Sequence, residues 1–455
     1  MTVFVNRTLN LKKIKAIGFD MDYTLVRYNT ENFERLVHQT VVDKLVQNKK
    51  YPEVLRKQVF DIKRAIQGLV IDKRTGNILK LSRYGKVKSA YHGTQILDFK
   101  KQQEIYAGKA IDLSDSHIKS LDTSFSLTHG VLYAQLVDLK NQGLLGTEKD
   151  YDTIAEDLKE AIDMAHSDGS VKDEVFKNSK PYIIQDPSIP QTLERLKKHD
   201  KKLLLITNSD YPYCRHLMDY AFNPFLKEHK HWKELFELVI VRAAKPNFFI
   251  SRADFLKIDP DSGMMSNYSG PTTTGLFQGG CAERLEKDFK LDGEEFLYLG
   301  DHIFGDVLTL KKHSNWRTGL IVEPLIGDLQ AFVQTRDIQK QINQDMETKE
   351  KLEKEINDFY DVRIETGKGF DKSKVDQLFQ QIEKVDEKIS ANINEYTKKL
   401  NPYWGELMRA GSEESFFMGQ VEKYACIYMS KISDLNDYSP RTYFRPRKRV
   451  LAHEQ

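Results

Sequence analysis

The chain has 455 residues, of which 40% are hydrophobic and 11% aromatic, so it can build large cores in roughly two to four domains and is not disordered. Its 69 basic and 67 acidic residues nearly cancel, which argues against a dedicated nucleic-acid-binding protein. The three scattered cysteines indicate neither a disulfide framework nor a zinc site. Without a signal-peptide layout or an apolar run of about 20 residues, we expect a cytoplasmic protein with no membrane partner.

The first predicted element is a short buried strand over residues 14–19, which ends in Asp20 and Asp22. In an open α/β sheet the carboxyl ends of the strands form the ligand crevice. Two carboxylates one residue apart repel each other unless a cation lies between them or a proton is shared. Mg²⁺, which prefers oxygen ligands, is the simplest such cation.

Residues 31–184 are predicted to form an inserted cap of mixed α/β structure. Apolar residues over 33–47 have helical spacing, and residues 68–91 contain apolar runs separated by glycine turns, as strands do. From about 100 to 180 the pattern is mainly helical. Residues 1–30 and 185–334 then form the core.

The core segment 185–334 alternates between helical and strand patterns. The alternation predicts a doubly wound, mostly parallel sheet. In chain order we expect a helix over 190–199, a strand over 202–206, a helix over 214–222, a strand over 235–241, a hairpin insertion over 255–280, a helix over 280–290, and strands over 295–299 and 316–322, the last closing the core.

Residues 335–400 are predicted to form a charged antiparallel helical hairpin, because apolar residues from Val375 to Tyr396 keep a 3-4 spacing and a glycine break lies at 366–369. A packing arm or an oligomer contact is favoured over a specific partner site, which leaves homo-oligomerisation open. Residues 401–455 are expected to pack on the core, with an amphipathic helix over 411–429 and a basic, solvated tail over 441–448.

Polar residues end four of the apolar strands, and in a parallel sheet such ends lie side by side. The set suits phosphoryl transfer, because carboxylates hold Mg²⁺ and an ammonium group neutralises phosphate oxygens. It consists of Asp20 and Asp22, Thr207 with Asn208 and Ser209, Lys245, and Asp301 with Asp306.

Each group has a predicted role. Asp20, first after its strand, is the nucleophile that forms an aspartyl-phosphate, and Asp22 is the general acid and base. Mg²⁺ would lie between Asp20, the backbone carbonyl of Asp22 and Asp301. Asp306 would hold Lys245 or a metal-bound water, Thr207 would donate a hydrogen bond, and Asn208 and Ser209 would contact the substrate.

Each of these signals is weak alone. An Asp-x-Asp pair also occurs in glycosyltransferases and in ordinary turns, a Lys-Pro pair is usually a helix boundary, and a Gly-Asp pair after a strand is often only a turn. Four such signals in order, each ending a strand, are far more specific to one catalytic crevice.

The motifs 20–25, 207–211, 245–246 and 300–306 together resemble those of the haloacid dehalogenase superfamily, and more narrowly of the cytosolic purine (IMP–GMP) 5′-nucleotidase family. The similarity extends to residues 68–72, 76–77, 91–93, 316–318 and 409–412, and it is weakest over 335–400. It implies a Rossmann-like core and a Mg²⁺-dependent nucleotidase acting on 6-oxopurine nucleoside monophosphates. Some members of the family also transfer the phosphoryl group to a nucleoside.

By this resemblance, Phe125 would stack on the base, and Asp163, His166 and Lys172 would lie near the base, ribose and phosphate. Lys159 stands where the family has an arginine facing the base oxygen, and a lysine offers a point charge instead of a planar fork. Without the resemblance, a surface pair at i, i+3 is the favoured interpretation of Asp163 and His166, and a core position that of Phe125.

Three other functions remain open: a phosphatase of the same chemistry acting on another metabolite, a non-catalytic nucleotide sensor whose helical arm binds a partner, and, more remotely, a glycosyltransferase. The first differs only in the cap. The second is disfavoured because every expected catalytic residue type is present.

Overall fold

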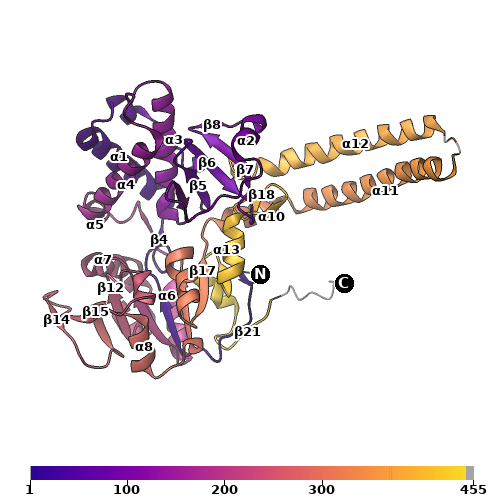
Figure 1. The fold of residues 1–455 in the computed structure, drawn as a ribbon. Helices are drawn as coiled ribbons and strands as arrows, with labels where there is room; N and C mark the ends of the chain where they lie inside the picture. Colours follow the sequence, from indigo (N-terminus) through magenta and orange to yellow (C-terminus); the bar gives the residue numbers. More distant parts are fainter. Residues whose placement is uncertain (1, 368, 370, 447–455) are drawn as a thin grey trace. The chain divides into compact units, whose positions relative to one another are not determined.

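The computed structural model describes residues 2–367, 369 and 371–446 (Figure 1). The described residues form two compact units. One comprises the residues up to Glu323 together with those from Leu407 onward, and the other comprises Pro324–Glu406. The predicted boundaries between core, cap, hairpin and tail stay predictions, and the two units are described separately.

A ten-stranded sheet forms the centre of the first unit, and its strands from β20 through β15 pair in parallel. β1 and β13 pair antiparallel with their neighbours in this sheet. In spatial order the strands are β1 (Val3–Val5), β20 (Ile427–Met429), β17 (Arg317–Ile321), β16 (Phe296–Gly300), β3 (Ala16–Phe19), β11 (Lys202–Ile206), β12 (Leu238–Val241), β15 (Gly275–Gly279), β13 (Phe255–Ile258) and β14 (Met265–Asn267).

Helices precede or connect the parallel strands. They are α6 (Ser188–Lys198) before β11, α7 (Tyr211–Ala221) before β12, α8 (Ala282–Phe289) before β16, α9 (Thr309–His313) before β17 and α13 (Phe416–Tyr424) before β20. The sequence produces this order because its central strands are continuous apolar runs: all residues of β3, β12 and β16 are buried. The predicted α/β, doubly wound and mostly parallel fold class is confirmed.

Three details of the prediction were wrong. Residues 255–280 are not only a hairpin insertion, because Phe277 is fully buried in the core and β15 pairs in parallel with β12. The strand over 316–322 does not close the sheet, since β20 and β1 follow it. The helix expected over 411–429 spans only Phe416–Tyr424: Ser415 caps its first turn, and the apolar run Ile427–Met429 fills a strand position beside β17.

The cap segment contains a five-stranded antiparallel sheet in the order β8-β7-β6-β5-β9. Its elements are α1 (Thr30–Lys49), β5 (Leu69–Asp72), β6 (Asn77–Leu81), β7 (Val87–His92), β8 (Gln95–Ile96), α2 (Phe99–Tyr106), β9 (Ile118–Leu121), α3 (Leu127–Asn141), α4 (Tyr151–Ser167) and α5 (Lys172–Lys177). The chain enters this segment through β4 (Arg27–Tyr28) and leaves it through β10 (Ile183–Ile184), and these two strands pair with each other.

Short strands pair elsewhere in the first unit: β2 (Leu9–Asn10) with β21 (Tyr443–Phe444), and β18 (Arg409–Ala410) with β19 (Glu413–Glu414). The second unit consists of α10 (Leu325–Gln334), α11 (Arg336–Thr366) and α12 (Lys372–Thr397). α11 and α12 form a helical hairpin, in which Ile356, Val375 and Leu378 are buried together. None of the described helices combines the length and the apolarity that a membrane span requires.

Loss of a core ring should destabilise the sheet measurably. Phe296 of β16 is fully buried and stacks on Trp316 with ring centroids 4.4 Å apart. We expect Phe296→Ala to lower the free energy of unfolding by about 3–5 kcal/mol, because the vacated space can collapse only in part. Phe99→Ala, at a side chain that is 75% exposed, is the matched control for a denaturant titration. Equal effects of the two substitutions would contradict the packing described.

Candidate active site

The carboxyl ends of four adjacent strands bring the predicted residues together. Asp20 follows β3, Thr207 follows β11, Lys245 lies in the loop after β12 and Asp301 follows β16. The spatial order β16-β3-β11-β12 makes these ends neighbours although Asp20 and Asp301 are far apart in the sequence. Asp306 joins them from η8 (Ile303–Leu308), the helical turn after Asp301.

A buried ammonium group lies at the centre of the cluster. The Nζ of Lys245 is 2.8 Å from Oδ1 of Asp20 and 2.8 Å from Oδ1 of Asp306, and its side chain is 3% exposed. Nζ also donates to the hydroxyl of Tyr298 at 2.9 Å, and that hydroxyl donates to the carbonyl of Ile206 at 3.0 Å. Burial alone would lower the pKa of Lys245, but the two carboxylates hold it well above its usual value.

Three carboxylates face this single ammonium group. One oxygen each from Asp20, Asp301 and Asp306 lies within 4.8 Å of the other two. Oδ2 of Asp301 is buried and has no hydrogen-bond partner among the described residues. Burial, together with Asp20 and Asp306, raises the pKa of Asp301 well above its usual value. A hard divalent cation would satisfy the orphaned oxygen and the surplus negative charge, so the donor set fits Mg²⁺.

Burial also raises the pKa of Asp20 to about 7; Lys245 opposes that shift, and Asp306 and Asp22 add to it. Its Oδ1 accepts a hydrogen bond from the backbone N–H of Met21 at 2.7 Å. A cation beside the carboxylate would favour its ionised form, which is the form a nucleophile needs.

The carboxylate of Asp22 lies outside the three-carboxylate group. The hydroxyl of Tyr28 donates to its Oδ1 at 2.6 Å, and the hydroxyl of Ser209 donates to its Oδ2 at 2.7 Å. Burial raises the pKa of Asp22, while these two hydrogen bonds oppose the shift. A raised pKa suits a group that must both give and take a proton.

Thr207 and Asn208 shape the loop around Lys245. The carbonyl of Thr207 accepts from the N–H of Ala243 at 3.0 Å. The side chain of Asn208 accepts from the N–H of Lys245 at 2.7 Å and donates to its carbonyl at 3.0 Å. The hydroxyl of Ser209 and the amide of Asn208 therefore hold protein groups in this structure, and their predicted substrate contacts stay predictions.

Among the cap residues, Phe125 and Lys172 contact residues of the core, and His166 lies beside Phe125. The ring of Phe125 meets that of Tyr23 edge-on with centroids 4.6 Å apart, and that of His166 at 6.3 Å. Burial lowers the pKa of His166, and nearby Lys172 adds to this. Nζ of Lys172 is 2.6 Å from Oδ2 of Asp210, which precedes α7.

Lys159 and Asp163 lie on α4 with exposed side chains. Of the five predicted substrate residues of the cap, the structure thus places Phe125 and Lys172 against core residues and His166 beside Phe125. The roles of all five in binding stay predictions.

Sequence reasoning missed three tyrosines. Tyr28 holds Asp22, Tyr213 contacts the hydroxyl of Tyr28 at 3.2 Å, and Tyr298 supports Lys245. Tyr298 is buried inside β16 and reads as an ordinary strand residue. The sequence signal is a single tyrosine hydroxyl in an otherwise apolar strand.

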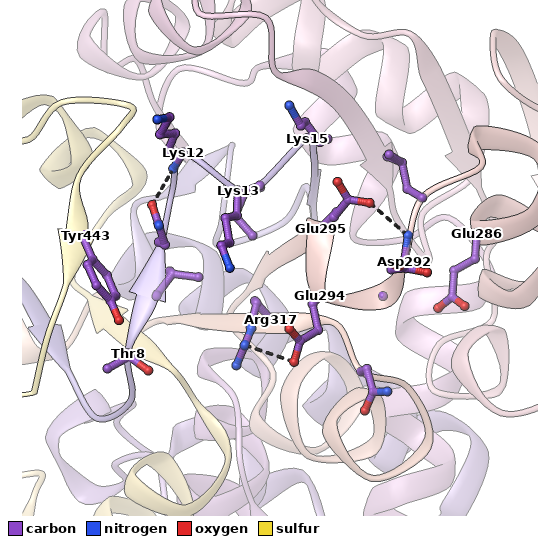
Figure 2. Close-up of a pocket in the computed structure, with 16 residues that line it drawn as sticks. Thr8, Lys12, Lys13, Lys15, Glu286, Asp292, Glu294, Glu295, Arg317 and Tyr443 are labelled. Carbon is purple, nitrogen blue, oxygen red and sulfur yellow. Dashed lines mark hydrogen bonds and ion pairs between the residues drawn. The ribbon is translucent and has the colours of Figure 1, made fainter.

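A separate hollow lies at the opposite edge of the sheet, where β3, β16 and β17 begin (Figure 2). It has a volume of about 1120 Å³. Lysines 12, 13 and 15 line it together with carboxylates that include Glu294 and Glu295 (Figure 2). Arg317 pairs with Glu294 at 3.2 Å. None of the predicted site residues lines it, so we place the candidate active site at the carboxyl ends.

Comparison with known proteins identifies the family of this chain. A family model described as the 5′ nucleotidase family matches residues 3–455. A 5′-nucleotidase domain-containing protein of Dictyostelium discoideum is 27% identical, covering 99% of this chain and 74% of that protein. 5′-Nucleotidase domain-containing protein 2 of Homo sapiens is 26% identical, covering 99% and 85%.

Among solved structures, an archaeal beta-phosphoglucomutase from Pyrococcus sp. strain ST 04 aligns over 68% of this chain and 86% of its own, at 12% identity and a TM-score of 0.32. A TM-score this low does not support the fold assignment, which rests on the strand order given above. The family match spans nearly the whole sequence and includes all four strand ends. The chain therefore belongs to the 5′-nucleotidase family, a membership that supports hydrolysis of a phosphate monoester.

Proposed function

We propose that this protein is a Mg²⁺-dependent 5′-nucleotidase that hydrolyses purine nucleoside 5′-monophosphates, IMP and GMP, through a phosphorylated Asp20. The observation that carries the proposal is the buried group formed by Lys245 and three carboxylates, in which one carboxylate oxygen has no partner among the residues that the structure describes. The family match supports the same chemistry. Transfer of the phosphoryl group to a nucleoside acceptor and a cytoplasmic location belong to the proposal as well.

The reaction divides into two displacements. In the first, a carboxylate oxygen of Asp20 bonds to phosphorus, the bond from phosphorus to the ribose O5′ breaks, and Asp22 gives its proton to that leaving oxygen. In the second, water attacks the phosphorus of the aspartyl-phosphate, Asp22 takes a proton from that water, and the Asp20 carboxylate is released. Inorganic phosphate and a nucleoside result.

The surrounding groups supply positioning and charge. Lys245, fixed between Asp20 and Asp306, can stabilise negative charge that develops on the phosphoryl oxygens without having to reorganise. Asp20, Asp301 and the backbone carbonyl of Asp22 would hold Mg²⁺, which supplies further neutralisation of phosphate charge. Thr207 at the end of β11 would donate a hydrogen bond to the phosphate.

The proposed substrate class depends on side chains of the cap. Phe125, at the core side of the cap, would stack on the purine, with Asp163, His166 and Lys172 contacting the base, ribose and phosphate and Lys159 facing the base oxygen. A phosphatase acting on another metabolite would keep the same core chemistry and lose this dependence on an aromatic platform.

Loss of the nucleophile should abolish turnover. We expect Asp20→Asn to lower kcat for IMP at least about a thousandfold, because an amide cannot form the covalent intermediate. Phosphate release measures this, and circular dichroism checks the fold. Asp261→Asn, at an exposed position in the β13–β14 turn, is the control and should leave kcat unchanged. Substantial activity in a folded Asp20→Asn variant would rule out the nucleophile.

Removal of the metal should be reversible. We expect EDTA to stop hydrolysis and Mg²⁺ to restore it. Asp301→Asn should raise the Mg²⁺ concentration that gives the half-maximal rate. The increase should exceed roughly 10- to 100-fold, which is the effect of losing a residue that only orients a metal ligand. A rate that is unaffected by EDTA after dialysis would contradict the proposed cation.

The base platform can be tested with two substrates. Stacking of a base on an aromatic ring is worth about 1–3 kcal/mol, so Phe125→Leu should lower kcat/KM for IMP about tenfold. The same substitution should leave hydrolysis of ribose 5-phosphate, which lacks a base, nearly unchanged. Phe99→Leu in α2 serves as the control. Equal losses on both substrates would show that Phe125 acts through packing and not through the base.

A further inference from the structure

Tyr28 lies at the junction between the core and the cap segment. It belongs to β4, through which the chain leaves the core, and it pairs with Ile183 of β10, through which the chain returns. Its side chain is 1% exposed. Its hydroxyl nevertheless donates a hydrogen bond to Oδ1 of Asp22 at 2.6 Å. The buried hydroxyl therefore contacts the residue that we propose as general acid and base.

The carboxyl group of Asp22 is held at both oxygens. Tyr28 donates to Oδ1 and Ser209 donates to Oδ2 at 2.7 Å, and the two donors come from segments that are far apart in the sequence. Two donors on opposite oxygens fix the plane of the carboxyl group. A fixed plane matters because proton transfer to a leaving oxygen depends on distance and direction.

A second hydroxyl supports that of Tyr28. The hydroxyls of Tyr28 and Tyr213 are 3.2 Å apart, and either can be the donor. Tyr28 can accept from Tyr213 while it donates to Asp22, so its hydroxyl has a partner on each side and stays directed at Oδ1. The proton that Asp22 transfers is then left to face the leaving oxygen.

Packing alone does not require this hydroxyl. The ring of Tyr28 stacks on Tyr23 with centroids 4.7 Å apart and meets Phe33 edge-on at 4.8 Å, contacts that a phenylalanine would keep. A buried hydroxyl is costly unless it is hydrogen-bonded, and here its partners are Asp22 and Tyr213.

We infer that Tyr28 is a positioning residue that orients the carboxyl group of Asp22 for proton transfer to the leaving ribose oxygen. The inference rests on the proposed function and adds a specific residue to it. In the first displacement, the contribution of Tyr28 should therefore be needed only when the leaving atom must receive a proton.

A pair of matched substrates isolates that step. The first is IMP, whose O5′ leaves as a poor alkoxide unless it is protonated. The second is the IMP analogue with sulfur in place of O5′, whose thiolate leaves without a proton. We expect Tyr28→Phe to lower the rate at which the first turnover releases the nucleoside from IMP about tenfold or more, and to change the same first-turnover rate for the sulfur analogue less than about twofold. KM should change little for either substrate.

Two further variants complete the experiment. Asp22→Asn should show the same selective loss in the first-turnover rate, larger in size. Tyr51→Phe removes another buried tyrosine hydroxyl that contacts a carboxylate, that of Asp157 at 3.0 Å in the cap, and should leave both rates unchanged.

Equal losses on both substrates in Tyr28→Phe would mean a structural role, and no loss on either would mean that the hydroxyl is dispensable. Both results overturn the inference while leaving the nucleotidase intact. A folded wild-type protein that hydrolyses neither substrate overturns the proposed function, and the inference with it.

Discussion

The ammonium group of Lys245, held between Asp20 and Asp306 in a buried crevice, is the interaction on which the site depends. Removing one partner from a buried ion pair typically costs about 3–5 kcal/mol, because an uncompensated charge remains. Here the compensation is incomplete, since Asp301 adds a third carboxylate, one oxygen of which has no hydrogen-bond partner within residues 2–367, 369 and 371–446. The protein thus keeps a surplus of negative charge where a cation and a phosphate can bind together.

The fold satisfies this constraint by placing the ends of β16, β3, β11 and β12 next to one another. Ion pairs also fix β4, through which the chain enters the cap segment. Arg27 of β4 pairs with Asp186 at 3.0 Å and with Glu323 at 2.6 Å, and its neighbour Tyr28 reaches Asp22. Two adjacent residues of β4 therefore have different contacts. Arg27 forms ion pairs where the chain enters the cap segment, and Tyr28 donates a hydrogen bond to the proposed general acid, Asp22.

The sequence was sufficient to predict the parallel sheet and the convergence of Asp20, Lys245 and Asp301, because apolar runs ending in polar residues are a local signal. It was insufficient for β1 and β20, whose few residues become strands only when β20 pairs with β17 and β1 pairs with β20. It could not find Tyr28, because an aromatic residue in a β-rich stretch predicts packing, and only the tertiary structure shows where the hydroxyl points. Nor could it show that Asn208 braces the backbone of Lys245.

The central claim is that Asp20 itself becomes phosphorylated. Rapid quenching of the enzyme during turnover of IMP, followed by borohydride reduction and peptide mass spectrometry, tests this directly, since reduction converts an aspartyl-phosphate into homoserine. The account predicts homoserine at position 20 alone, in the presence of Mg²⁺. Modification of a different residue, or turnover with no modified residue under conditions that trap aspartyl-phosphates in a known control enzyme, would contradict it.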